Sequence, residues 1–175
     1  MVSSDSAVRP GMFVGTVEMA VQNAMLKVGE VAPNFTLTAN NWSSVTLADY
    51  AGKVKIISVV PSLDTRVCAA QTRRFNAEAA GLGSDVVILT VSADLPYAQR
   101  RWCAAEGIDQ VVTLSDHLDM NFSDAFGVHV IDMRICQRAL FVLDRDDVVR
   151  YAEYVPVIGS EVNFDAGLAK AKELV

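Results

Sequence analysis

The chain has few of the residues that build metal sites and disulfide scaffolds. Its 175 residues include three cysteines, Cys68, Cys103 and Cys136, and two histidines. No Cys-x-x-Cys pair is present, so neither a zinc ribbon nor the usual dithiol redox loop is expected. His117 and His129 lack the spacing of a metal-binding pair. We therefore expect no resident metal and no other cofactor.

Long apolar runs and an excess of positive charge are also missing. The longest apolar runs, such as 56–60 and 86–91, are far shorter than the roughly 18 residues of a membrane-spanning helix. The N-terminus lacks the basic start and apolar core of a secretory signal. The net charge of -6 argues against a nucleic-acid partner. These features predict a cytoplasmic protein that binds neither a membrane nor nucleic acid.

The composition is that of a globular protein, with 51% hydrophobic and 21% charged residues. Ser, Asp, Pro and Gly are frequent in residues 1–11, which predicts a flexible N-terminus. Residues 12–175 have no repeat, linker or low-complexity tract, and their length suits one domain.

Alternating apolar strands and amphipathic helices predict an α/β fold, a three-layer sandwich with helices flanking a mixed central sheet. A small N-terminal β-hairpin is expected around the letters VQNA, between 12–20 and 25–28. The other expected strands are 35–38, 45–50, 54–60, 86–91, 111–114, 139–143 and 148–155. The expected helices are 68–80, about 94–107, 121–126 and a C-terminal helix that carries Phe164, Leu168 and Ala171.

Cys68 is the strongest candidate for a reactive residue. A buried strand, a seven-residue loop and a helix follow one another here, and Cys68 falls in the first turn of that helix. The first turn has unpaired backbone N–H groups and the positive end of the helix dipole, both of which favour a reactive thiolate. Thr65 can present its hydroxyl beside the sulfur, and Pro61 can shield the site from water. The pattern predicts a nucleophilic cysteine.

Three sequence blocks carry a resemblance to a known family. The spacing Pro-x-x-x-Thr-x-x-Cys, formed by Pro61, Thr65 and Cys68, resembles the signature of the peroxiredoxin superfamily. The string SLDTRVCAAQTRRFN is similar to its thiol peroxidase branch, as is SADLPYAQRRWCAAEG, which contains Cys103. The block RALFVLD resembles the strand that supplies the active-site arginine, here Arg138. Because the blocks occur in the family's order, together they are more specific than any one motif.

The resemblance, which runs from about Met12 to the C-terminus, implies a thioredoxin-like fold and a complete reaction. The Cys68 thiolate would attack hydrogen peroxide or an organic hydroperoxide and become a sulfenic acid. Arg138, the Thr65 hydroxyl and the backbone N–H of Cys68 would hold the peroxide. Cys103 would then form an intramolecular disulfide with Cys68, and thioredoxin would reduce it. The resemblance also implies a homodimer, but does not rank the peroxides.

The two cysteines are expected on different helices, which constrains the cycle. A disulfide needs Cα atoms within about 7 Å. The axes of packed helices lie roughly 8–10 Å apart. We therefore predict that at least one of the two cysteine-bearing turns unwinds during turnover.

Other functions stay open at this point. A peroxide sensor or redox relay would use the same cysteines. A Cys–His hydrolase would need a histidine held by a third group, and neither histidine lies in a block that suggests one. A non-catalytic interaction domain is the remaining class. Cys136 is interpreted as a buried or idle thiol.

Two features depart from the family pattern. Arg66 stands where a small residue or proline is usual between Thr65 and Cys68. The segment IDMRIC before Arg138 is shorter than in the relatives that the chain resembles. The charge of Arg66 would either lower the pKa of Cys68 further or alter substrate access, and the shorter segment would change the pocket wall. The sequence therefore leaves the substrate preference open.

Overall fold

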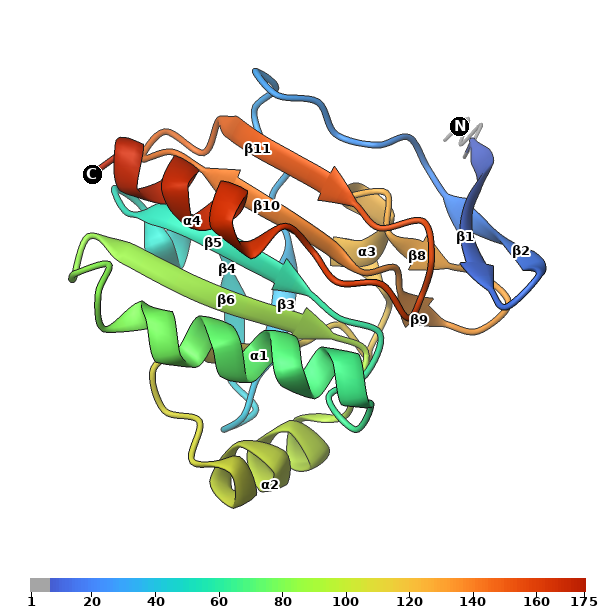
Figure 1. Cartoon of the computed structure of the whole chain (residues 1–175), viewed down its shortest axis with the longest axis horizontal. Coiled ribbons are helices and arrows are strands. Elements are labelled where there is room, and N and C mark those ends of the chain that lie inside the picture. Colours follow the sequence, from blue (N-terminus) through green and yellow to red (C-terminus); the bar gives the residue numbers. More distant parts are fainter. Residues whose placement is uncertain (1–6) are drawn as a thin grey trace.

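A seven-stranded mixed sheet forms the centre of the protein in the computed structural model, which describes residues 7–175 (Figure 1). Its strands are β3 (Thr36–Ala39), β4 (Ser44–Thr46), β5 (Val54–Val59), β6 (Val86–Ser92), β7 (Val112–Ser115), β10 (Ala139–Leu143) and β11 (Val149–Tyr154). They lie in the order β11-β10-β5-β6-β7-β3-β4. The strands β5, β6 and β7 are parallel to one another, whereas the outer pairs are antiparallel. The strands predicted for this sheet are all present, with ends that differ by a few residues.

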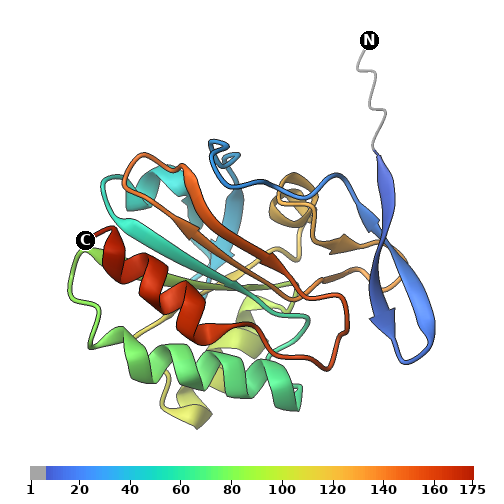
Figure 2. The same cartoon turned by 45° about the horizontal axis from the view of Figure 1, so that its top comes forward.

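Helices cover both faces of this sheet. The helices are α1 (Arg66–Ala79), α2 (Pro96–Glu106), α3 (Asn121–Ala125) and α4 (Phe164–Glu173), and a short 3-10 helix, η1 (Leu47–Tyr50), follows β4. The helices α1 and α4 lie side by side on one face, and α3 lies behind the sheet in the same view (Figures 1 and 2). The predicted three-layer sandwich is confirmed.

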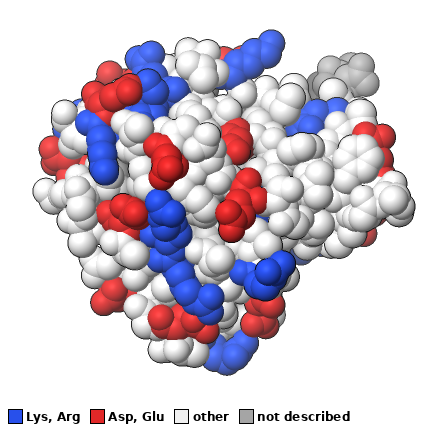
Figure 3. Space-filling model, in the orientation of Figure 1, with Lys and Arg blue, Asp and Glu red and all other residues white. Residues whose placement is uncertain are grey.

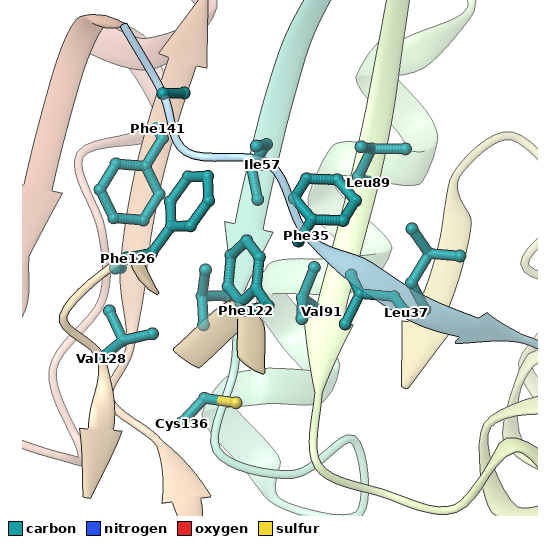
Figure 4. Packing of buried hydrophobic residues seen from close by; sticks show 14 of the residues in the cluster. Phe35, Leu37, Ile57, Leu89, Val91, Phe122, Phe126, Val128, Cys136 and Phe141 are labelled. Carbon is teal, nitrogen blue, oxygen red and sulfur yellow. The ribbon is translucent and has the colours of Figure 1, made fainter. Parts of the chain in front are cut away.

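Two apolar clusters fill the space between these layers. On the side of α1 and α4, Phe75 and Leu168 pack with Ile56 and Val142 of the sheet. On the side of α3, a group of phenylalanines packs with residues of β5 and β6 (Figure 4). Every residue of β5 and β10 is buried, which explains why their sequences are almost continuously apolar. The central strands are therefore held from both faces.

A second, four-stranded sheet contains the N-terminal hairpin. It consists of β1 (Val8–Val14), β2 (Val17–Gln22), β8 (His129–Val130) and β9 (Ile135–Cys136), in that order. The expected hairpin exists, but its turn is at Gly15 and Thr16 rather than in VQNA. Gly15 has a φ of 62°, which a two-residue turn of this kind requires. The glycine, not the polar VQNA segment, fixes the turn.

The flexible terminus predicted for residues 1–11 needs correction. Residues 8–11 belong to β1, which pairs with β2 over its length. Residues 1–6 lie outside the described part of the chain. The short strands β8 and β9 were not predicted, because two-residue strands carry no measurable alternation.

Charged residues of both signs are interspersed on the face that carries α1 and α4 (Figure 3). On the visible face, the basic side chains are bordered by acidic ones. Within residues 7–175, no helix has the length and apolar character needed to cross a bilayer.

Candidate active site

Cys68 lies where the sequence places it, in the first turn of α1. The helix begins at Arg66, and Thr65 is its N-cap residue. The amide of Ala69 donates to the carbonyl of Thr65 at 2.9 Å and closes the first turn. The Cys68 side chain is fully buried, and Pro61 is buried in the preceding loop. A cysteine in this position faces the unpaired N–H groups at the start of the helix.

Arg138 reaches Cys68 from the strand next to β5 in the sheet. It directly precedes β10, whose Ala139 is paired with Val59 at the end of β5. This register brings Arg138 to the edge at which the Cys68 loop begins. Its Nη2 donates to the Sγ of Cys68 at 3.3 Å and to the carbonyl of Ile158 at 3.0 Å. Only 1% of Arg138 is exposed, so the guanidinium is fixed beside the sulfur.

Gln71 binds the other terminal nitrogen, Nη1, of the Arg138 guanidinium. Its Oε1 accepts a hydrogen bond from Arg138 Nη1 at 2.9 Å, and its Nε2 donates to the hydroxyl of Ser58 at 2.8 Å. This contact of Gln71 was not predicted from the sequence. The available signal was its spacing, because residues three apart share one face of a helix. Cys68 and Gln71 therefore both face Arg138.

A pocket of about 230 Å³ opens onto the arginine. Within residues 7–175, the buried Nε of Arg138 has no hydrogen-bond partner. An N–H group that is buried without a partner is costly, and a small oxygen ligand would satisfy it. The residues that line the pocket are Pro61, Thr65, Arg66, Val67, Arg138, Ile158 and Gly159.

Thr65 lines this pocket, but its hydroxyl has a partner within the loop. The hydroxyl donates to the carbonyl of Ser62 at 3.0 Å. The structure thus brings Pro61, Thr65 and Arg138 together around one pocket next to Cys68. The Thr65 hydroxyl is available to a ligand through its remaining lone pairs or after rotation.

Asp94 anchors the loop that carries the site. Its carboxylate accepts hydrogen bonds from the Ser62 hydroxyl at 2.7 Å, the Leu63 amide at 2.8 Å and the Ser92 hydroxyl at 2.8 Å. Asp94 does not cap α2, because Leu95 is the N-cap residue and the Asp94 carboxylate binds the loop that precedes α1. Ser92 and Asp94, which lie between β6 and α2, thereby fix the position of the loop that leads to Cys68.

Cys103 lies on α2, close to the same apolar cluster. The cluster contains Cys68 and Trp102, and Cys103 packs against it with half of its side chain buried. Its Sγ is 3.6 Å from the hydroxyl of Thr113, which also accepts a hydrogen bond from Asn40. Burial raises the pKa of the Cys103 thiol, and the hydrogen bond with Thr113 opposes this increase. All three cysteines are free thiols in this structure.

Cys136 is buried in β9, at the edge of the aromatic core (Figure 4). Its Sγ is 3.1 Å from the hydroxyl of Ser123. Burial, with a smaller contribution from the negative charge of Asp116, raises the pKa of the Cys136 thiol. A protonated, inaccessible thiol is a poor nucleophile.

The histidines are engaged elsewhere. His117 Nδ1 is 3.0 Å from the Ser115 hydroxyl, and His129 Nδ1 is 2.7 Å from Asp124. In the described residues, neither histidine is a hydrogen-bond partner of Cys68, which disfavours a Cys–His hydrolase. The part of the chain that the structure describes contains no cluster of three His, Cys, Asp or Glu residues suited to a metal ion.

The chain is similar to known proteins over most of its length. The family model described as Redoxin matches residues 27–168. The chain belongs to the Redoxin family. It is 55% identical over 150 residues to a thiol peroxidase of Bacillus subtilis (strain 168), covering 86% of this chain and 89% of that protein. It is 51% identical over 149 residues to a thiol peroxidase of Streptococcus pneumoniae (strain ATCC BAA-255 / R6), covering 85% and 91%.

A solved structure gives the same result. A peroxiredoxin-like protein from Aquifex aeolicus superimposes with a TM-score of 0.88 at 32% identity, over 96% of this chain and 99% of that one. The resemblance to peroxiredoxins and the thioredoxin-like fold inferred from sequence are confirmed. The chain is a peroxiredoxin-type peroxidase on the strength of these relatives.

Proposed function

We propose that this protein reduces hydroperoxides with Cys68 as the nucleophile. The Cys68 thiolate attacks one peroxide oxygen, the S–O bond forms and the O–O bond breaks. The leaving oxygen takes a proton and departs as water or an alcohol. Cys68 is oxidised to the sulfenic acid while the peroxide is reduced, so the electrons balance.

The observation that carries this proposal is the contact between Cys68 and Arg138. A guanidinium 3.3 Å from the sulfur can stabilise the thiolate and the charge that develops on the peroxide oxygens. Its Nε is buried and free among the described residues, which supports a role in binding the peroxide. Thr65 and Pro61 line the same pocket, where we assign the first to peroxide binding and the second to excluding water.

Cys103 is the proposed resolving cysteine. Its thiolate attacks the sulfenic sulfur of Cys68, the disulfide forms and hydroxide leaves as water. This pairing is supported because Cys103 packs against the apolar cluster that contains Cys68 and Trp102. Cys68 is fully buried and both cysteines lie in helices, so we propose that one of these turns unwinds before the disulfide closes.

Reduction of that disulfide requires an external dithiol, for which we propose thioredoxin. Exchange with a partner thiolate passes through a mixed disulfide and regenerates both protein thiols. A cytoplasmic location would supply such a reductant. We also propose a homodimer, in line with the family resemblance, and sedimentation equilibrium would test it by giving the mass in solution.

The decisive experiment is thioredoxin-coupled peroxide consumption by the wild type, Cys68→Ser and Cys103→Ser. We expect turnover by the wild type and none by Cys68→Ser. Cys103→Ser should complete one oxidation, stop at the sulfenic acid and fail with thioredoxin. Full activity of Cys68→Ser would refute the proposal.

A peroxide sensor or redox relay would give a different pattern. In a sensor, peroxide would oxidise Cys68 as fast as in a peroxidase, but turnover with thioredoxin would be slow. The sensor would instead pass its disulfide to another protein. The coupled assay therefore separates an enzyme from a relay by the steady-state rate.

A further inference from the structure

Arg66 occupies an unusual position at the rim of the pocket that opens onto Arg138. It is the first residue of α1, it is exposed, and it lines the pocket with Val67. Among the described residues, no carboxylate lies within ion-pair distance of its guanidinium. The acidic residue two positions earlier, Asp64, lies instead 3.7 Å from Arg101. The charge of Arg66 is thus available to a ligand.

Local structure gives no reason for a cation here. The N-terminus of a helix carries partial positive charge, so an arginine in the first turn is mildly unfavourable. The first turn of α1 has no acidic residue that would offset it. Residues that break a local rule without a structural compensation are concentrated at functional sites.

The charge of the pocket is opposite to that of the whole protein. The chain has a net charge of -6, yet the pocket is lined by two arginines and no carboxylate. Arg138 lies at the buried end, beside Cys68, and Arg66 at the exposed rim. The wall between them includes Pro61, Val67 and Ile158, which are apolar. Such a pocket suits a molecule with an apolar body and a negative group away from its reacting end.

We propose that Arg66 makes the pocket selective for organic hydroperoxides that carry a carboxylate. The hydroperoxide group lies at Cys68 and Arg138, the apolar body packs against Val67 and Ile158, and the carboxylate pairs with Arg66 at the rim. The carboxylate stays unchanged while the O–O bond breaks as described above. This inference rests on the proposed role of Cys68.

The size of the effect follows from an exposed ion pair. Two unit charges about 5–7 Å apart near a wet surface attract enough to change a rate constant about threefold to tenfold. Salt weakens such an attraction, because the Debye length at 0.15 M ionic strength is about 8 Å. The preference should therefore be modest and should decrease as salt is added.

The test compares a medium-chain hydroperoxy carboxylic acid with its methyl ester, used below their aggregation concentrations. Quenched flow gives the second-order rate constant for loss of the Cys68 thiol with each peroxide. In the wild type we expect the acid to react about threefold to tenfold faster than the ester at low salt. In Arg66→Gln this ratio should fall to about one, and Arg66→Lys should keep most of it.

Arg145→Gln is the matched control. Arg145 is exposed beyond the opposite end of β10, where it pairs with Asp85, and its loss changes the net charge equally. Its acid-to-ester ratio should equal that of the wild type. If the acid-to-ester ratio of rate constants in Arg66→Gln equals that of the wild type, the inference is wrong. This holds even if both peroxides react more slowly, since equal slowing leaves the ratio unchanged. Failure of the proposed function would look different, because Cys68→Ser would then still consume both peroxides.

Discussion

The Nη2 of Arg138 lies 3.3 Å from the Sγ of Cys68, although 70 positions separate the two residues. The antiparallel pairing of β10 with β5 creates this contact, because it aligns Ala139 with Val59. Both residues are almost fully buried, so neither has to be reoriented when a peroxide arrives. A preorganised cation of this kind lowers a barrier more than a mobile surface cation does.

Replacing Arg138 by Gln should slow the oxidation of Cys68 by hydrogen peroxide about 100-fold to 1,000-fold. The neutral amide removes the positive charge next to the sulfur and next to the developing oxygen charge. Arg138→Lys should recover only part of the rate, since an ammonium cannot reproduce two parallel N–H donors. Stopped-flow rate constants check this, with circular dichroism to confirm folding. A folded Arg138→Gln with the wild-type rate constant would contradict the assignment.

Gln71 should act as a positioning residue for the same guanidinium. In Gln71→Met the Nη1 of Arg138 and the hydroxyl of Ser58 lose their partner. We expect the Cys68 oxidation rate to fall about tenfold and stability to fall by about 1–3 kcal/mol, the cost of unpaired buried polar groups. Stopped-flow kinetics and urea unfolding measure the two effects separately.

Gln99→Met supplies the matched control for stability. Gln99 is also a buried helical glutamine, and it donates to the Ser92 hydroxyl and to the carbonyl of Leu114, both at 3.0 Å. Its loss should cost similar stability but leave the first oxidation of Cys68 unchanged, because the Ser92 hydroxyl can still donate to Asp94 and Gln99 does not bond to Arg138. Equal slowing in Gln71→Met and Gln99→Met would mean that the rate reports general destabilisation and not the orientation of Arg138.

The sequence predicted the sheet and the position of Cys68 at the start of a helix because both depend on local patterns. The buried strand β5, the loop and the helix start are consecutive, so Cys68 can be placed from its neighbours. The position of Arg138 before a buried strand indicates only that the arginine needs a partner, and its role was inferred through the family resemblance.

Contacts that depend on the tertiary fold could not be predicted in this way. Gln71 meets Arg138 only after β10 pairs with β5. Asp94 has the composition of a helix cap, but it binds a loop some 30 positions earlier in the chain. The hairpin turn was misplaced for a local reason, since Gly15 was not recognised as the residue that adopts a positive φ.

Cys136 should make stability depend on pH without taking part in the reaction. Burial raises the pKa of its thiol above that in the unfolded chain. Above about pH 8.5 the unfolded chain releases a proton that the folded protein retains, so stability falls as pH rises. At lower pH both states hold the proton and the contribution is constant.

Cys136→Ala should therefore flatten this dependence. Between pH 8.5 and 10 the wild type should lose about 1.6 kcal/mol more stability than the variant, with a slope that approaches about 1.4 kcal/mol per pH unit. Urea unfolding under reducing conditions at several pH values measures the difference. The thioredoxin-coupled rate of the variant should equal that of the wild type. A parallel pH dependence would show that the Cys136 thiol titrates normally, and a lost rate would assign it a redox role.

Gly127 should be the least replaceable glycine of the described chain, because two independent constraints meet there. Its φ is 65°, and a Cβ at this position would lie 2.2 Å from the carbonyl oxygen of Ala24. Its own carbonyl accepts a hydrogen bond from Arg9 at 2.7 Å, which connects the N-terminal hairpin to the body of the protein. Gly127→Ala should cost about 2–4 kcal/mol, since the backbone of Ala24 would have to move.

Gly81→Ala is the control for this substitution. Gly81 has no positive φ, and the nearest atom to its added Cβ is the carbonyl oxygen of Glu78 at 3.5 Å. We expect a change within about 1 kcal/mol, of either sign. Thermal unfolding of both variants, with proteolysis to detect release of the hairpin, measures the difference. Equal stabilities would mean that the segment at Ala24 adapts without cost, and that the hairpin does not depend on Gly127.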